Sequence, residues 1–327
     1  MNKNDSLKLL NNELSSLTST AIGRRAFLSS LPVLLAACSS VQKTRMREGD
    51  NSGQQAALTP QEERKMADEY GPQMEKEYPP LRDQFSQTYI KELGDKIVRA
   101  NNIGGKPYEY RFTLVDAKMV NAFALPAGAI YVTKPLLLMA ENEAELAGVI
   151  GHEIGHVKAR HTAERIQKEK SEKTKSILLG LGGALLGGAA GIGLAKAICK
   201  KEDKECLKRV ALYGAAAGAA GGLLIQKFAF MAHSREDEME ADRIGFRTSV
   251  AAGYHPLYVG KFYEKLLAME QQYSKKQDKF SATFTDAMST HPPSIQRVNQ
   301  MKELASQVSN QGDINSADFN RIKQRLS

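Results

Sequence analysis

The pattern of polar and apolar residues indicates helices in two stretches early in the chain. Thr59, Pro60 and Glu62 form the pattern of a capped helix start, in which Thr59 is the cap, Pro60 takes the first helical position and Glu62 closes a capping box. A second stretch with an apolar face at helical spacing runs from about Arg82 to Ala100. The pattern therefore predicts two successive helices.

The hydrophobic pattern then changes from helical spacing to short β-rich runs. Residues 110–115 alternate between apolar and polar side chains, and residues 129–133 form a second β-rich stretch, with a Pro-Ala-Gly turn at 126–128 between them. The chain is expected to be α+β and mostly helical, with a small β-sheet. Further helices are predicted from about 141 past 161 and near 226–252, 256–273 and 293–307.

The first 37 residues have the pattern of an export signal. Basic residues Arg24 and Arg25 precede an apolar run from Leu31 to Ala37, which is shorter than the roughly 20 residues needed to span a bilayer. The end of this run, Leu-Ala-Ala-Cys, resembles the bacterial lipobox, in which Cys38 becomes lipidated and N-terminal. The alternative is a hydrophobic N-terminal helix with a chance cysteine.

The segment Arg-Arg-Ala-Phe-Leu at 24–28 is also similar to the twin-arginine export motif. The alternative is a Sec lipoprotein signal with two ordinary basic residues. Residues 39–58 are polar and lack periodicity, so we expect a flexible tether over 38–58. The remaining residues, 59–327, are expected to form one domain.

Composition and charge exclude some classes of protein. The chain is 42% hydrophobic and 25% charged, which is ordinary for a globular protein and disfavours disordered or fibrous classes. Its net charge is +8, and loss of residues 1–37 would leave 290 residues with a net charge of +6. This charge is too small to indicate nucleic-acid binding by itself.

The strongest chemical signal is the HExxH motif at 152–156. His152 and His156 are four residues apart and share one helix face, so both imidazoles can reach one metal ion. A catalytic zinc site keeps one position open for water, and Glu153 is placed to take a proton from that water. The alternative is a helix with two surface histidines, but the apolar run 146–151 predicts a buried helix. The motif therefore predicts one Zn²⁺ per chain.

His161 is a possible third ligand that the spacing argues against. It follows His156 by five residues, and Ala159 stands where metzincins have a glycine. At 100° per residue, His161 also points away from the helix face of His152. We therefore expect His161 to be a surface residue.

A better source of the third ligand is the acidic segment 234–242. Glu238 and Asp242 are four apart on one helix face, so Glu238 can bind the metal while Asp242 accepts the free N–H of a ligating histidine. The alternative is a charged, solvated helix face. The segment's other acids are assigned to such a face: Glu236, Asp237 and Glu240.

With these segments the chain resembles the HtpX- and BepA-like gluzincin metalloproteases, and most closely their LoiP-like lipoprotein branch. The resemblance implies that His152, His156 and Glu238 bind zinc. It also implies that Glu153 is the general base and that Asp242 lies behind the ligands. The matching segments, within about residues 60–307, are 121–126, 130–132, 145–156, 234–245, and 290–293 with Arg297.

Two further parts of the site follow from the resemblance. His291 lies in a Thr-His-Pro-Pro motif, and the family implies that it approaches the zinc, either blocking the water site or stabilising the oxyanion. Asn121, Ala122 and Phe123 begin a segment that resembles the family's active-site strand. Such an edge strand would bind an extended peptide by β-addition.

An unusual insertion lies between the two ligand segments. Two Gly/Ala-rich runs, 177–195 and 210–225, predict an antiparallel helical hairpin within 176–228. In one continuous helix the Cα atoms of Cys199 and Cys206 would be about 10 Å apart, which is beyond the reach of a disulfide, so a disulfide between them requires a turn at the hairpin tip. The alternatives are a transmembrane hairpin and a mobile or membrane-touching segment.

These expectations combine into one predicted function. The chain is expected to be a zinc endopeptidase that is anchored to the outer membrane through lipidated Cys38 and faces the periplasm. Its expected polypeptide substrates are misfolded envelope proteins. One alternative is an integral-membrane protease whose insertion spans the bilayer. Another is a chaperone-like binding module with the same fold, against which the presence of Glu153 argues.

Overall fold

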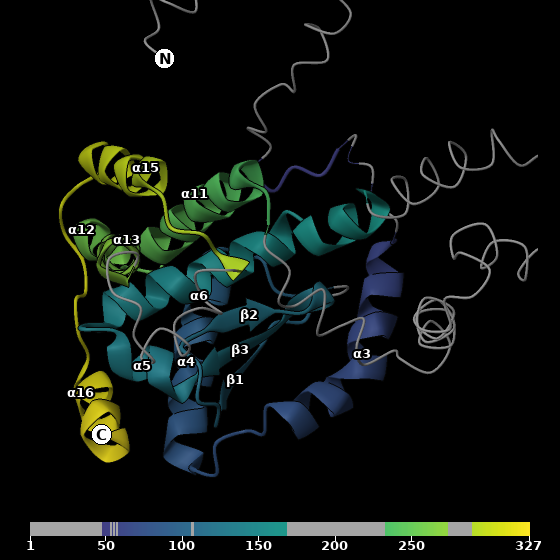
Figure 1. Ribbon diagram of the computed structural model, residues 1–327, viewed down its shortest axis with the longest axis horizontal. Helices are drawn as coiled ribbons and strands as arrows, with labels where there is room; N and C mark the ends of the chain where they lie inside the picture. The colour runs from purple at the N-terminus through teal and green to yellow at the C-terminus, as the bar shows by residue number, and fades with distance from the viewer. Residues whose placement is uncertain are drawn as a thin grey trace, which may run out of the picture. The chain divides into compact units, whose positions relative to one another are not determined.

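The first two labelled helices in Figure 1 begin at side-chain caps. α3 (Pro60–Glu77) starts at Thr59, whose hydroxyl accepts a hydrogen bond from the Glu62 amide while the Glu62 carboxylate accepts one from the Thr59 amide. α4 (Gln84–Ala100) starts at Asp83, whose carboxylate accepts a bond from a first-turn amide. Both predicted helices are confirmed. The buried face of α4 includes Tyr89, Ile90, Leu93 and Ile97.

The computed structural model describes most of the chain after the predicted export signal. The described residues are 48–52, 54, 56, 58–105, 108–168, 233–273 and 290–327. Cys38, the 176–228 insertion, Cys199 and Cys206 lie outside them, so the predictions for these segments stay predictions. Among the described residues, no helix combines the length and the apolar character needed to cross a membrane.

Three short strands form a mixed sheet in the order β1-β3-β2. β1 (Arg111–Val115) and β3 (Ala129–Thr133) are the two predicted strands, and they pair in parallel. β2 (Ala122–Ala124) pairs antiparallel with β3 and lies at one edge of this sheet. The turn before β3 places Ala127 at a φ of 65°, in the left-handed region.

Two long helices pack against each other beside the sheet. α6 (Glu143–Lys158) lies between the sheet and α11 (Arg235–Ala251) in Figure 1. Glycines allow their backbones to touch: a Cβ on Gly245 would lie 2.6 Å from the His152 nitrogen, and one on Gly155 would lie 2.7 Å from the Ala241 oxygen. The glycines therefore set the short separation of α6 and α11.

The C-terminal helices complete the main core, which is shared with α4, the sheet and α6. The predicted helix 256–273 is divided after Val259 into two helices, and the final helix was not predicted. The fold is thus mostly helical with a small mixed sheet, as expected. Further helices in the described part of the chain are α5 (Lys134–Met139), α12 (Pro256–Val259), α13 (Lys261–Tyr273), α15 (Ile295–Ser306) and α16 (Ala317–Leu326).

The end of the predicted tether is bound to the domain. The Asn51 side chain donates to the Lys158 carbonyl at 2.8 Å, and the Gln54 side chain donates to the Ala159 carbonyl at 2.8 Å. These bonds satisfy carbonyls at the end of α6, which lack partners within the helix. Asn51 and Gln54, which fall within the predicted 38–58 tether, are therefore attached to the domain rather than free of it.

Candidate metal centre

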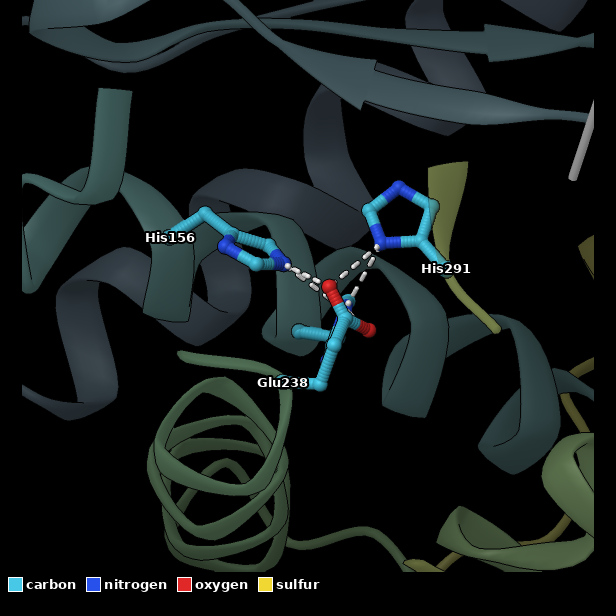
Figure 2. Close-up of side chains that lie close together, drawn as sticks. His156, Glu238 and His291 are labelled. Atoms are coloured by element: carbon cyan, nitrogen blue, oxygen red, sulfur yellow. Dashed lines mark hydrogen bonds and ion pairs between the residues drawn. The ribbon is translucent and has the colours of Figure 1, made fainter. Parts of the chain in front are cut away.

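Four side chains converge between α6, α11 and the segment before α15. α6 supplies His152 and His156, α11 supplies Glu238, and His291 precedes α15. Figure 2 shows His156, Glu238 and His291 pointing toward one another. One ligand atom from each residue lies within 4.8 Å of the other three. The structure thus brings together the three predicted metal ligands and His291.

The ring nitrogens in this cluster face one another. His152 Nε2 lies 2.9 Å from His156 Nε2 and 3.2 Å from His291 Nδ1, while Glu238 Oε1 lies 3.3 Å from His156 Nε2. Imidazole lone pairs that converge next to a carboxylate repel one another unless a proton or a metal ion lies between them. Nitrogen and carboxylate donors in this arrangement fit a divalent metal such as zinc.

Asp242 occupies the position predicted for it. Its Oδ1 lies 2.9 Å from Nδ1 of His152, on the side of the ring away from the cluster. This contact orients the ring so that Nε2 faces the other ligands. Burial lowers the pKa of His152, but Glu238 and Asp242 outweigh that effect and raise it to about 9 in the metal-free protein.

The pKa of His156 is shifted in the opposite direction to that of His152. Burial, reinforced by the charge on nearby His152, holds the pKa of His156 well below its ordinary value. The His156 ring is therefore neutral, which is the form that binds a metal ion. His233, directly before α11, stacks on this ring with the two centroids 4.0 Å apart.

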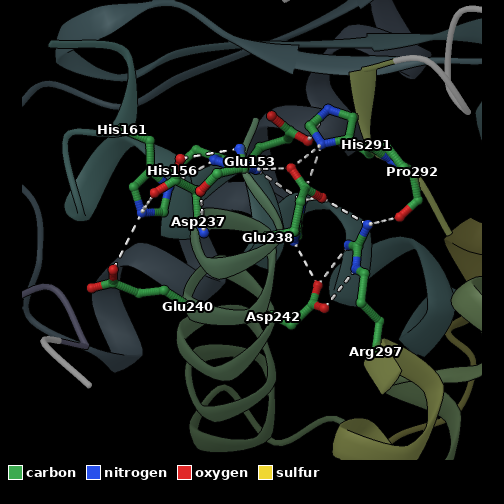
Figure 3. Close-up of polar contacts among 12 residues, drawn as sticks. Glu153, His156, His161, Asp237, Glu238, Glu240, Asp242, His291, Pro292 and Arg297 are labelled. Atoms are coloured by element: carbon green, nitrogen blue, oxygen red, sulfur yellow. Dashed lines mark hydrogen bonds and ion pairs between the residues drawn. The ribbon is translucent and has the colours of Figure 1, made fainter. Parts of the chain in front are cut away.

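Arg297 joins the two carboxylates behind the cluster. Its Nε and Nη2 each donate to Asp242 at 2.7 Å, and its Nη1 lies 2.7 Å from Glu238 Oε2 (Figure 3). Burial opposes ionisation of the acids, but the Arg297 charge keeps the pKa of Glu238 well below its ordinary value and also lowers that of Asp242. Both carboxylates are thus held ionised. The sequence matched Arg297 to the family but gave it no role.

Glu153 lies beside the cluster and borders a largely apolar pocket. Its Oε1 is 3.5 Å from His291 Nε2, and its side chain is buried. Asn121 and Ala122 line the same pocket from the start of β2. The other side chains that line it are Leu136, Val149, His152, Phe262, Tyr263, Leu266, His291 and Arg297.

Phe123 is separated from this pocket. Its ring packs against Tyr131 and Tyr78, with centroid distances of 5.1 and 5.4 Å, in a small hydrophobic cluster that is separate from the main core. Successive side chains of a strand point to opposite faces, so Ala122 and Phe123 cannot both face the pocket. Of the three predicted substrate-binding residues, the structure brings only Asn121 and Ala122 to it.

The prediction that His161 lies on the surface was wrong. Its side chain is only 1% exposed, and its Nδ1 lies 2.8 Å from Nδ1 of His156. The rotation argument failed because it assumed a continuous helix, whereas Arg160 adopts a φ of 57°. This break lets His161 approach the back of the His156 ring.

The assignment of neighbouring acids to a solvated face was wrong in two cases. Glu240 is fully buried and its Oε2 lies 3.4 Å from His161 Nε2. Asp237 is also buried, because its carboxylate closes the capping box with Ser234 at the start of α11. Only Glu236 of these three acids is exposed.

An HExxH helix facing a carboxylate from a second helix, in a mostly helical domain with a small sheet, defines the class of metallopeptidases. Comparison with known families gives a specific assignment: the profile of Peptidase family M48 matches residues 84–305. The chain belongs to Peptidase family M48. The resemblance to HtpX- and BepA-like proteases is therefore confirmed.

The chain is similar to several characterised relatives. It is 28% identical to the Beta-barrel assembly-enhancing protease of Yersinia pestis over 83% of this chain, and 28% identical to that of Escherichia coli (strain K12) over 81%. These matches cover 49% and 48% of the two relatives, so the chain spans about half their length. It is also 32% identical to the Mitochondrial metalloendopeptidase OMA1 of Arabidopsis thaliana, over 57% of this chain and 31% of that protein.

Proposed function

We propose that the protein is a zinc-dependent endopeptidase of the bacterial cell envelope. The observation that carries this proposal is the convergence of His152, His156 and Glu238 beside Glu153, in a chain of Peptidase family M48. A binding module would have no need of an acid at the position of Glu153. The geometry therefore favours hydrolysis over binding alone.

The proposed site divides the chemistry among a few side chains. His152, His156 and Glu238 would hold one Zn²⁺, which when bound lowers the pKa of a coordinated water to about 7. Glu153 takes a proton from the attacking water at its carboxylate and returns it to the leaving amine. Asp242 and Arg297 keep His152 and Glu238 oriented and charged.

We further propose that His291 closes this site in the conformation described here. Its Nδ1 lies 3.2 Å from both His152 Nε2 and Glu238 Oε1, where a fourth ligand belongs. A zinc site with four protein ligands is closed, whereas a catalytic site keeps one position for water. His291 must therefore move aside before peptide hydrolysis.

The pocket beside Glu153 supports a proposal for substrate binding. Ala122 begins an edge strand to which an extended peptide can add by backbone hydrogen bonds. Next to it, Val149, Phe262 and Leu266 offer an apolar surface for one substrate side chain. We propose that the enzyme cleaves extended segments beside an apolar residue.

The cellular role rests on the sequence and on the relatives. We propose a signal peptide over 1–37, a lipid anchor at Cys38 and location at the periplasmic face of the outer membrane. The name Beta-barrel assembly-enhancing protease suggests misassembled outer-membrane proteins as substrates. The 176–228 hairpin with a Cys199–Cys206 disulfide belongs to the same proposal, and its rival is a span across the membrane.

Digestion of casein by the zinc-loaded protein tests the proposed function. We expect the wild type to degrade casein. Glu153→Gln should degrade it at least about 100-fold more slowly, because the general base is removed. His291→Ala is expected to degrade casein faster, because it frees the fourth position. Activity that survives in Glu153→Gln would refute the proposed chemistry, and a slower His291→Ala would indicate that His291 stabilises the oxyanion instead.

A further inference from the structure

A chain of buried polar groups leads away from the back of the His156 ring. His156 Nδ1 lies 2.8 Å from His161 Nδ1, and His161 Nε2 lies 3.4 Å from Glu240 Oε2 (Figure 3). The amide of Gly49, in the segment before α3, donates to Glu240 Oε1 at 3.3 Å. His156, His161, Glu240 and Gly49 thus form a continuous series of contacts from the metal centre to the N-terminal segment.

The direction of these hydrogen bonds follows from the chemistry of imidazole. If Nε2 of His156 binds a metal ion, the proton of its neutral ring is on Nδ1, which must donate. Nδ1 of His161 must then accept, so the proton of a neutral His161 is on its Nε2. That N–H points to the Glu240 carboxylate, with Asp237 Oδ1 as a second acid 3.9 Å away.

The local backbone is shaped to make these contacts. The left-handed conformation of Arg160 turns the chain sharply after α6 and directs His161 back toward His156. Arg160 is held there because its Nε donates to Glu63 at 3.0 Å and its Nη2 donates to the Leu58 carbonyl. An unfavourable backbone conformation for arginine is therefore maintained by α3 and the residue just before its cap.

We propose that His161 and Glu240 are positioning residues that hold His156 with Nε2 directed at the metal. They would do for His156 what Asp242 does for His152, so each ligating histidine has its own acidic support. The Gly49 amide completes the series by fixing Glu240. This inference rests on the proposed function only in taking His156 as a metal ligand.

The zinc affinity of full-length variants tests the proposal without depending on activity. His161→Phe keeps an aromatic ring but removes the acceptor, and we expect zinc to bind about 10- to 100-fold more weakly in a chelator competition. Glu240→Gln should weaken binding by a smaller factor, because its amide oxygen can still accept the His161 proton. Glu236→Gln is the matched control: it neutralises an exposed acid on the same helix, and its affinity should equal that of the wild type.

Nitrogen NMR of the zinc-loaded wild type supplies a readout that needs no variant to fold. The proposal requires the Nδ1–H tautomer at His156 and the Nε2–H tautomer at His161. A proton on Nδ1 of His161, or unchanged zinc affinity in both variants, would overturn the positioning role while leaving the proposed function intact. Failure of the wild type to bind zinc would instead overturn the proposed function.

Discussion

Arg297 shows how much of the site depends on one residue that binds no metal. It is 1% exposed and contacts Asp242 and Glu238 through three nitrogen atoms, each at 2.7 Å. Its guanidinium also lies 4.7 Å from the centre of the Tyr263 ring. Arg297 therefore pairs its single positive charge with two buried acids, which both come from α11.

Replacing Arg297 by methionine should strongly destabilise the metal-free protein. The change leaves Asp242 and Glu238 buried without their cation, which typically costs about 3–5 kcal/mol. Urea unfolding in the presence of a chelator measures this loss. Arg99→Met, at an arginine whose side chain is 70% exposed, should change the free energy of unfolding by less than about 0.5 kcal/mol. Equal stability of the two variants would contradict the role given to Arg297.

The site residues divide into those that sequence spacing can predict and those that it cannot. The spacing predicted His152, His156, Glu238 and Asp242 because each pair stands four residues apart on one helix, and that relation survives in α6 and α11. His161 was misjudged because one backbone angle, the positive φ of the preceding residue, redirects it. No local pattern predicts such a turn.

At the scale of elements, the contact between α6 and α11 positions the ligands. Glu238 reaches His152 and His156 only because the two helix backbones meet at glycines. A Cβ on Gly245 would lie 2.6 Å from the nitrogen of His152 and 2.8 Å from the carbonyl carbon of Gly151. These atoms are backbone and cannot rotate away.

Gly245→Ala should therefore destabilise the protein, although alanine favours helix. We expect a loss of about 1–3 kcal/mol from overpacking, and weaker zinc binding because α11 is displaced. Gly71→Ala is the control without a packing clash, since Gly71 lies in α3 with nothing within 4 Å of an added Cβ beyond its chain neighbours. Its stability should change by less than about 1 kcal/mol, because the restriction that Pro72 places on the residue before it offsets the gain in helix propensity. Thermal unfolding compares the two. A more stable Gly245→Ala protein would show that the helices are not in backbone contact.

Asp83 attaches α16 to the start of α4. Asp83 caps α4 and also accepts hydrogen bonds from Arg325 at 2.6 and 2.8 Å. The Arg325 and Ser86 hydrogen bonds lower the pKa of Asp83 to about 2, from an ordinary value of 3.8. The stabilisation from the Asp83 charge is therefore complete above the ordinary pKa and is lost as the pH falls through about 2.

Asp83→Asn keeps a good helix cap but removes this charge. We expect the wild type to unfold at a higher temperature than the variant near neutral pH, with the difference disappearing as the pH approaches 2. Thermal unfolding between pH 2 and 7 measures the difference. Asp318→Asn, at an exposed residue of α16, should follow the wild-type curve. A difference that persists unchanged at low pH would contradict the role of the charge.

The helices and strands were predictable where a helix-capping motif or a regular hydrophobic spacing marks them in the sequence. The capping motif predicted α3, the apolar period predicted α4, and β1 and β3 are β-rich runs bounded by a turn. β2 is only three residues long, and it forms because β3 offers it a partner. α16 buries Phe319 and Ile322 against the main core, and this long-range packing leaves no signal in the local sequence pattern.

At the scale of the whole molecule, the metal centre joins parts of the chain that are far apart in sequence. Three separate segments supply residues 152 and 156, residue 238, and residue 291. The N-terminal segment also takes part, because the Gly49 amide donates to Glu240, the acid at the end of the contacts behind His156. The match to M48 extends from 84 to 305 and includes all four residues. The central claim is that these segments meet around one metal ion.

The zinc content of the purified full-length protein tests this claim most directly. We predict about one zinc per chain in the wild type, in Glu153→Gln and in the control Glu236→Gln, because none of these changes removes a ligand. Glu238→Gln, which replaces a proposed ligand by a residue of the same shape, should lose most of its zinc while remaining folded by circular dichroism. Absence of zinc from the wild type, or a full equivalent in Glu238→Gln, would contradict the account.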